Sequence, residues 1–199
     1  YGDWSSDVCS SDLFPVLQVL KELTDAFALN PITLLQAPPG AGKSTVLPLH
    51  LLNQNFLNNK KIIIIEPRRL AAKAVAARLA DQLGEAVGES VGYIIRFESQ
   101  QSDRTKILVV TEGIFINHLQ QDPGLTDFAL IILDEFHERS LQSDLSLMMV
   151  RQSQQLFRPD LKILIMSATL ETERLSSLLK APVIKSLGRQ YPEIGRAHV

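Results

Sequence analysis

The chain has 199 residues, of which 45% are hydrophobic and 21% are charged, and its formal net charge is −2. This length and composition indicate one sizeable globular domain, or two small ones, with a core that needs no disulfides to hold it. The charge balance excludes a strongly basic domain, the single cysteine excludes an internal disulfide framework and suits a reducing cytosol, and no apolar run approaches the roughly 20 residues that cross a bilayer.

The two ends of the chain differ from the rest. Residues 1–12 are rich in Ser and Asp and have no apolar period. Asp7 to Asp12 can be encoded by GAC GTG TGC TCT TCC GAT, whose reverse complement encodes Ile194 to Val199, and the string resembles a sequencing-library adapter. We therefore expect translated adapter at residues 1–12 and 194–199, with two disordered tails as the alternative, and a single domain at residues 13–193.

Strands and helices are predicted to alternate along the domain. Apolar, β-branched runs predict strands at residues 32–36, 61–65, 91–97, 107–111, 130–133, 162–166 and 183–184. Apolar residues at helical spacing predict helices at residues 13–27, 46–52, 70–83, 113–121, 143–156 and 172–179, and residues 98–104 are expected to form a polar loop. Four consecutive isoleucines at 62–65 indicate a strand buried on both faces. The pattern predicts an α/β fold with one doubly wound, mostly parallel sheet and helices on both faces.

A glycine-rich segment lies between the first predicted strand and its helix, and it reads Ala37-Pro38-Pro39-Gly40-Ala41-Gly42-Lys43-Ser44-Thr45. Glycines at φ > 0 let successive N–H groups surround an anion, so the segment is typical of a phosphate-binding loop. Lys43 is expected to reach the β- and γ-phosphates, and Ser44, in the first turn of the helix, to ligate Mg²⁺. A chance glycine-rich turn is the alternative, and Ala37 stands where the pattern has glycine.

Acidic residues follow a later buried strand. Asp134 and Glu135 come directly after 130–133, at the carboxyl edge where α/β sheets bind ligands. Asp134 is expected to hold Mg²⁺ through water, and Glu135, which also faces the metal, to polarise the attacking water. Acidic pairs at strand ends are otherwise common as solvated caps.

Three further polar side chains lie near that acidic pair in the predicted fold. His137 is either structural or a sensor of the nucleotide state. Ser167 and Thr169 follow the strand 162–166. They are expected to hydrogen-bond His137 or the acidic pair and so couple the site to its surroundings, although Thr169 is equally suited to cap a helix.

Five ordered segments together resemble the motifs of DEAH-box helicases, in the bacterial HrpB-type branch. Motif I is the phosphate loop; motifs Ia, Ib, II and III correspond to Glu66-Pro67-Arg68-Arg69, Thr111-Glu112-Gly113, Asp134-Glu135-Phe136-His137-Glu138-Arg139 and Ser167-Ala168-Thr169. Phe136 departs from the alanine that names the box.

The resemblance implies roles that spacing alone does not give. It implies a RecA-like ATP-binding domain with ATP and Mg²⁺ as cofactors, and it makes Glu135, Lys43 and His137 the catalytic candidates. Arg68, Arg69 and Thr111 would contact single-stranded nucleic acid, expected to be RNA, where a solvated arginine pair is the alternative. Arg78 would stack on the nucleotide base, or else pair with Asp81 or Glu85, and the role of Arg96 stays open.

The resemblance also implies that half of the active site lies elsewhere. Such helicases hold ATP between two RecA-like domains, and this chain stops soon after motif III. We expect a cytoplasmic ATP-dependent RNA helicase as the parent protein and an inactive fragment. The alternative is a nucleotide-dependent switch or adaptor module without helicase activity.

Overall fold

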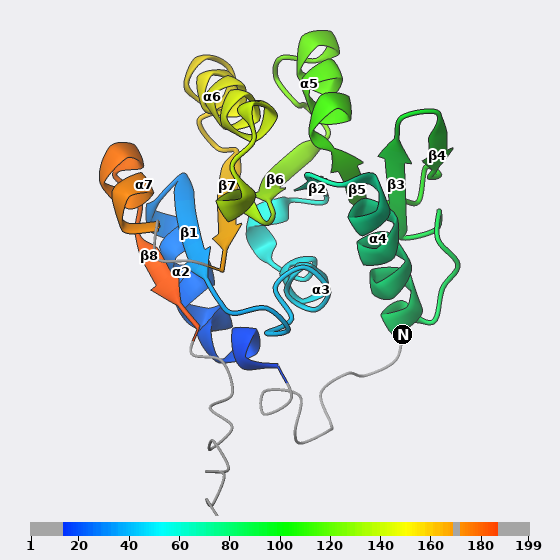
Figure 1. Cartoon of the computed structure of the whole chain (residues 1–199), viewed down its shortest axis with the longest axis horizontal. Helices are drawn as coiled ribbons and strands as arrows, with labels where there is room; N and C mark the ends of the chain where they lie inside the picture. The colour runs from blue at the N-terminus through cyan, green and yellow to red at the C-terminus, as the bar shows by residue number, and fades with distance from the viewer. Residues whose placement is uncertain (1–13, 169–171, 187–199) are drawn as a thin grey trace, which may run out of the picture.

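A sheet of eight strands organises the computed structural model, which describes residues 14–168 and 172–186 (Figure 1). The strands are β1 (Ile32–Gln36), β2 (Lys61–Glu66), β3 (Val91–Ile95), β4 (Glu98–Gln100), β5 (Ile107–Thr111), β6 (Phe128–Leu133), β7 (Lys162–Ser167) and β8 (Val183–Lys185). Their order is β4-β3-β5-β2-β6-β7-β1-β8, and every neighbouring pair is parallel except β3 and β4. The predicted fold class is therefore confirmed.

Helices cover both faces of this sheet. They are α2 (Leu20–Leu29), α3 (Leu47–Leu51), α4 (Arg69–Leu83), α5 (Glu112–Gln121), α6 (Leu141–Leu156) and α7 (Thr172–Leu179), with 3₁₀ turns η1 (Pro15–Val19), η2 (Asn55–Leu57) and η3 (Phe136–Glu138). Figure 1 shows α5 and α6 on one side of the sheet and α3 and α4 on the other.

Two hydrophobic cores result, one on each face, and β2 shows how its sequence supplies both. Because successive side chains of a strand point to opposite faces, Ile62 and Ile64 pack with α2, α3 and α4, whereas Ile63 and Ile65 pack with α5, α6 and α7. All four isoleucines are at most 2% exposed. An apolar run without alternation therefore indicated a central parallel strand correctly.

Several details differ from the sequence-based prediction. The first helical stretch opens as the 3₁₀ turn η1 before α2 begins. Residues 98–100 form the short edge strand β4 instead of a loop, after a two-residue turn at Arg96 and Phe97. All three β4 residues are exposed, so the strand has no buried face and shows no apolar alternation to detect. The turn η3 was also not predicted.

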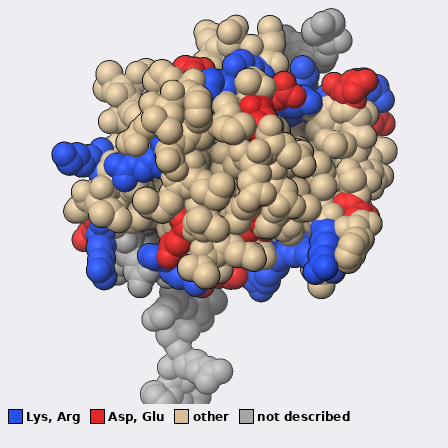
Figure 2. Space-filling view, turned by 90° about the horizontal axis from the view of Figure 1, so that it is seen from above, with Lys and Arg blue, Asp and Glu red and all other residues tan. Residues whose placement is uncertain are grey.

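The surface over α5 and α6 carries few charges in its middle. Figure 2 shows this face from above, with most Lys, Arg, Asp and Glu side chains around its margin. Leu141, Leu145 and Met148, spaced for one face of α6, are 85%, 45% and 60% exposed. Within the described part of the chain, no helix is long and apolar enough to span a membrane.

Candidate active site

The register of the sheet brings the predicted motifs to one edge. Gln36 at the end of β1 is opposite Ser167 at the end of β7, and Glu66 at the end of β2 is opposite Thr111 at the end of β5. The N–H of Asp134 donates to the carbonyl of Ile65 at 3.0 Å, which fixes motif II beside β2. The site is therefore assembled at the carboxyl ends of parallel strands, where such sheets bind ligands.

The phosphate loop has the backbone shape that its glycines allow. Gly40 and Gly42 have φ of +77° and +88°, in the region that other residues adopt only with strain. A Cβ on Gly42 would lie 3.0 Å from the ring of Phe14, so this glycine is also needed for close packing against the segment before η1. The N–H of Ala37 donates to the carbonyl of Ser167 at 3.1 Å, which ties the start of the loop to motif III.

The position of Ser44 corrects one prediction. The helix after the loop begins at Leu47, so Ser44 lies in the turn before it and not in the first helical turn. The N–H groups of Val46 and Leu47 both donate to the carbonyl of Gly42, which closes that turn. Pro48 favours a helix start just before itself, because its ring has the helical φ and its missing N–H is not needed in the first turn.

Lys43 crosses from the loop to motif II. Its side chain is buried, with 2% exposed, and Nζ lies 3.5 Å from Oε1 of Glu135. The lysine of the phosphate loop and the expected catalytic carboxylate are therefore in direct contact.

A third carboxyl group joins the acidic pair. Glu66 is 2% exposed and lies beside Asp134, which is 4% exposed. Oδ1 of Asp134 accepts from the N–H of Glu135 at 2.8 Å, whereas Oδ2 is buried without a hydrogen-bond partner of good geometry. The sequence pattern places Glu66 in motif Ia but does not predict that it joins the acidic pair. A charged residue ending a strand otherwise made of isoleucine was the available signal.

Proton binding at this centre follows from burial. Burial and the neighbouring Asp134 raise the pKa of Glu66 to about 10, so Glu66 holds a proton at neutral pH. Burial also raises the pKa of Asp134, against the lowering effect of hydrogen bonds from Glu66 and Ser44. A divalent cation beside Asp134 would favour its charged form instead.

The buried carboxylate of Asp134 also bears on whether these residues could bind a metal ion. Among the described residues, no cluster of three His, Cys, Asp or Glu is arranged to hold a metal alone. A buried carboxylate with one oxygen that has no hydrogen-bond partner of good geometry, beside the Ser44 hydroxyl, suits a cation that takes its remaining ligands from phosphate and water, as Mg²⁺ does.

His137 links motif II to motif III. Its Nδ1 lies 3.3 Å from Oε2 of Glu135 and 3.4 Å from the N–H of Ala168, which donates to it. A single ring nitrogen cannot accept from Ala168 and donate to Glu135 in one tautomer, so the two contacts are alternatives. Ala168, between the two predicted partners, makes this contact through its backbone; Ser167 is buried at the end of β7, and Thr169 lies outside the described residues.

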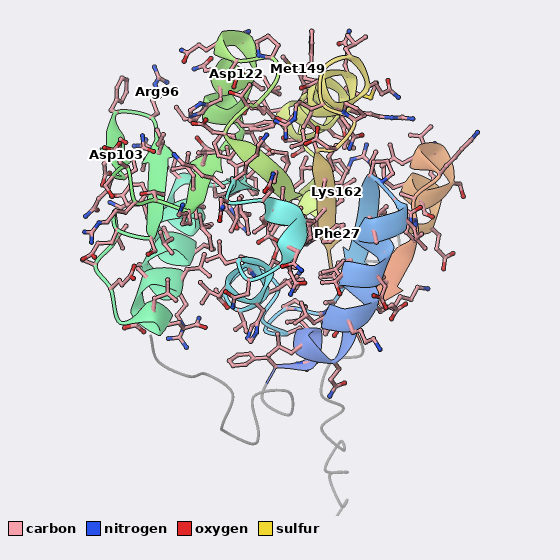
Figure 3. All side chains as sticks on the ribbon, turned by 180° about the vertical axis from the view of Figure 1, so that it is seen from behind. Phe27, Arg96, Asp103, Asp122, Met149 and Lys162 are labelled. Carbon is pink, nitrogen blue, oxygen red and sulfur yellow. The ribbon has the colours of Figure 1, made fainter. Side chains whose placement is uncertain are left out.

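Basic side chains lie along the same edge, beyond motif II. The guanidinium of Arg68 pairs with the carboxylate of Glu138, and Arg69 Nη2 donates to the carbonyl of Arg96 at 3.2 Å. Figure 3 shows Arg96 at the tip of the β3–β4 hairpin, pointing away from the body of the protein. Phe97 beside it is 90% exposed, with the Arg96 guanidinium 4.7 Å from its ring centre.

Arg78 lies on α4 near the phosphate loop. Its guanidinium is 4.0 Å from the carboxylate of Asp81, the pairing expected as the alternative, with a side chain 62% exposed. One turn further, Gln82 donates to the carbonyl of Thr45 at 2.9 Å. Because residues four apart share a helix face, Arg78 lies on the side of α4 that meets the loop. Gln82 was not predicted as part of the site.

Comparison with known proteins agrees with this geometry. The model of the DEAD/DEAH box helicase family matches residues 18–178. The chain belongs to this family.

Relatives of this helicase domain include the ATP-dependent RNA helicase HrpB of Escherichia coli, 52% identical over 89% of this chain and 22% of HrpB. An HrpA homologue of Haemophilus influenzae is 40% identical over 89% of this chain and 14% of the relative. The splicing helicase prp22 of Schizosaccharomyces pombe is 40% identical over 89% of this chain and 15% of the relative. The chain thus spans less than a quarter of each of these proteins.

Solved structures support the same branch of the helicase family. A crystal structure of E. coli DEAH/RHA helicase HrpB has a TM-score of 0.86 at 52% identity, covering 90% of this chain and 23% of HrpB. A crystal structure of E. coli DExH-box NTPase HrpB has a TM-score of 0.87 at 50% identity, covering 93% of this chain and 23% of HrpB. The resemblance to the HrpB-type branch is confirmed, and so is the RecA-like helicase fold.

Proposed function

We propose that this chain is the nucleotide-binding half of an ATP-dependent RNA helicase, with ATP and Mg²⁺ bound at the edge formed by motifs I and II. The main support is the approach of Lys43 to Glu135 across the phosphate loop, at 3.5 Å. A buried ammonium and a half-buried carboxylate, on segments 92 residues apart, meet where a terminal phosphate would lie. A phosphate between them would take the lysine as its partner and release Glu135 to a water molecule.

Each site residue then has a role within this proposal. Backbone N–H groups of Gly40, Ala41, Gly42, Lys43, Ser44 and Thr45 would surround the phosphates, and Arg78 would lie against the base. The Ser44 hydroxyl and Asp134, with Glu135 nearby, would hold Mg²⁺, which neutralises phosphate charge during transfer. Glu135 would orient and polarise water as general base, and His137 would report its state to motif III through Ala168.

Nucleic acid would bind along the neighbouring edge. Arg68, Arg69 and Thr111 end or follow strands β2 and β5, and the exposed Arg96 and Phe97 continue the same edge. Guanidinium groups suit phosphates, and an exposed aromatic ring suits base stacking, so this edge fits a single strand. RNA is the proposed strand because the relatives compared above bear the name RNA helicase.

The proposal includes a partner domain and a place in the cell. A second RecA-like domain would close over the nucleotide, and the protein would act in the cytoplasm. The helicase domain itself would comprise residues 13–193, with residues 1–12 and 194–199 as non-native tails; both tails lie outside the described residues.

The variant Lys43→Ala tests the nucleotide site. It should abolish the rise in melting temperature caused by MgATP, because the ammonium that pairs with the phosphates is gone. Without nucleotide its melting temperature should stay near that of the parent, since Glu135 keeps 28% of its side chain in solvent. The exposed Lys21→Ala on α2 is the matched control and should keep the full nucleotide effect. A Lys43→Ala protein that is stabilised like the parent would remove the phosphate loop from the proposal.

A further inference from the structure

The segment that carries motif II is held in a strained shape. We call residues 134–140 the motif II loop; it joins β6 to α6. Glu135 and Arg139 have φ of +47° and +41°, although neither is glycine. The backbone of a non-glycine residue is strained at such a φ and persists only where the surrounding structure holds it. The first end is fixed by β6 and by the contacts of Glu135 and His137 described above.

The far end of the motif II loop is fixed by Glu112. This carboxylate is 5% exposed and lies in the first turn of α5, directly after Thr111. The hydroxyl of Ser140 donates to its two oxygens at 2.9 and 3.1 Å, and the hydroxyl of Ser143 donates to Oε1. Ser140 is the N-cap of α6, so one carboxylate joins the beginnings of α5 and α6.

Capping of α6 does not by itself require this carboxylate. Ser140 Oγ already accepts from the N–H of Ser143 at 2.8 Å, which is the usual N-cap bond. Among the described residues, no Lys, Arg or His side chain forms an ion pair with Glu112. The hydroxyl donors, and no cation among the described residues, satisfy this buried carboxylate, so the link between α5 and α6 depends on its hydrogen bonds to Ser140 and Ser143.

We propose that Glu112 is a positioning residue that couples the nucleotide site to the nucleic-acid edge. A bound nucleotide that takes Lys43 as its partner would break the contact between Lys43 and Glu135, and so would change the conformation of the near end of the motif II loop. Because the strained loop is short and Ser140 is bonded to Glu112, the change reaches the start of α5 and Thr111, where a strand would bind. This inference rests on the proposed function, and it adds a residue to which nothing above gives a role in coupling.

Amide hydrogen exchange of the full chain, with and without saturating MgATP, tests the coupling. In the parent, MgATP should slow exchange at residues 37–45 and 134–139, and also at residues 113–118 in α5, by about fivefold, the lower end of common coupling factors. Glu112→Gln keeps the shape but weakens acceptance from the two serines. In this variant the protection of residues 37–45 and 134–139 should remain, while that of residues 113–118 should disappear.

Two further variants keep the test decisive. Ser143→Ala removes one donor and leaves the Ser140 cap, so it should reduce the protection in α5 even if Glu112→Gln folds poorly. Asp122→Asn is the matched control, because Asp122 accepts hydrogen bonds from Gly124 and Thr126 at the other end of α5 (Figure 3). It should loosen that end without changing the effect of nucleotide on residues 113–118.

The outcomes separate this inference from the function on which it rests. Protection of the phosphate loop and motif II without protection of α5 in the parent would overturn the role of Glu112 alone. So would unchanged protection of α5 in both Glu112→Gln and Ser143→Ala. No protection at residues 37–45 in the parent would overturn the proposed nucleotide site, and with it the coupling.

Discussion

At the scale of residues, two buried carboxyl groups lie together at the ends of β2 and β6. Glu66 and Asp134 are both buried, and charging both would place two negative charges in a low-dielectric site. The proton on Glu66 removes one of these charges. A metal ion beside Asp134 would stabilise the ionised form of the nearby carboxyl groups. These residues therefore suit a bound cation better than an empty site.

The variant Glu66→Gln should be more stable than the parent in metal-free buffer at pH 8. The pKa of Glu66 in the fold, about 10, lies above its ordinary value of 4.5. The stability that this proton provides is therefore fully present below about pH 4.5 and is lost progressively as the pH rises towards 10. An amide needs no proton to stay neutral, so the variant should gain over the parent as the pH rises, by a few degrees in melting temperature for roughly 1 kcal/mol.

Thermal melts of both proteins between pH 5 and about 9 measure this difference, because the proton on Glu66 affects stability between its ordinary and its raised pKa. The exposed Glu22→Gln is the control and should follow the parent. Identical pH dependence in Glu66→Gln and the parent would contradict a protonated Glu66.

At the scale of elements, Arg158 after α6 sets where β6 begins. Arg158 is 9% exposed, and its guanidinium donates to the carbonyls of Gly124, Leu125 and Phe128 at 3.2, 3.0 and 3.1 Å. It also forms a bidentate pair with Asp160 at 2.9 and 2.8 Å. Because β6 carries Asp134 at its other end, this fork of hydrogen bonds fixes the strand that presents motif II.

The Arg158–Asp160 pair should weaken in acid. Hydrogen bonds from Arg158 lower the pKa of Asp160 to about 2, from 3.8. The contribution of the pair is therefore present above about pH 3.8 and is lost as the pH falls through about 2. Asp160 is 65% exposed, so solvent screens the pair and the effect should be small.

Urea unfolding of the parent and of Asp160→Asn measures that contribution as a difference. The parent should be the more stable at pH 6, and the gap should close as the pH approaches 2, the lowered pKa. A gap that persists unchanged in acid would show that Asp160 acts through something other than its charge.

At the scale of the whole molecule, the candidate site residues that the structure describes lie at one edge of one sheet, except Arg78, which lies on α4. In the proposed function that edge provides one side of a nucleotide site, and the chain covers 22% of the HrpB relative. The described arginines near motif II are engaged within the domain, Arg68 with Glu138 and Arg139 with Asp144 at 2.9 Å. None of these is directed to neutralise a γ-phosphate from the opposite side.

The isolated chain should therefore show no RNA-stimulated ATP hydrolysis. An arginine supplied from a second side is worth roughly 10³–10⁵ in rate in related phosphoryl transfer. MgATP should still raise the melting temperature, because Lys43, Ser44 and Asp134 are in place. Phosphate release with and without single-stranded RNA measures the effect. Robust stimulated turnover would mean that this domain holds a complete active site, contrary to the two-domain proposal.

The sequence by itself determined seven of the eight strands, most helices and the chemical groups of the candidate nucleotide site. Local patterns sufficed there: isoleucine runs require burial on both faces, and glycines at 40 and 42 are adjacent to the lysine they serve. The tertiary structure alone decided which groups meet, including Glu66 with Asp134, Gln82 with Thr45 and Glu112 with Ser140. The strand order places β2 between β5 and β6, and helix packing places α5 beside α6. Such neighbours depend on side-chain packing between distant segments, which no local period records, and that is why the carboxyl beside motif II and the joint at Glu112 emerged only from the fold.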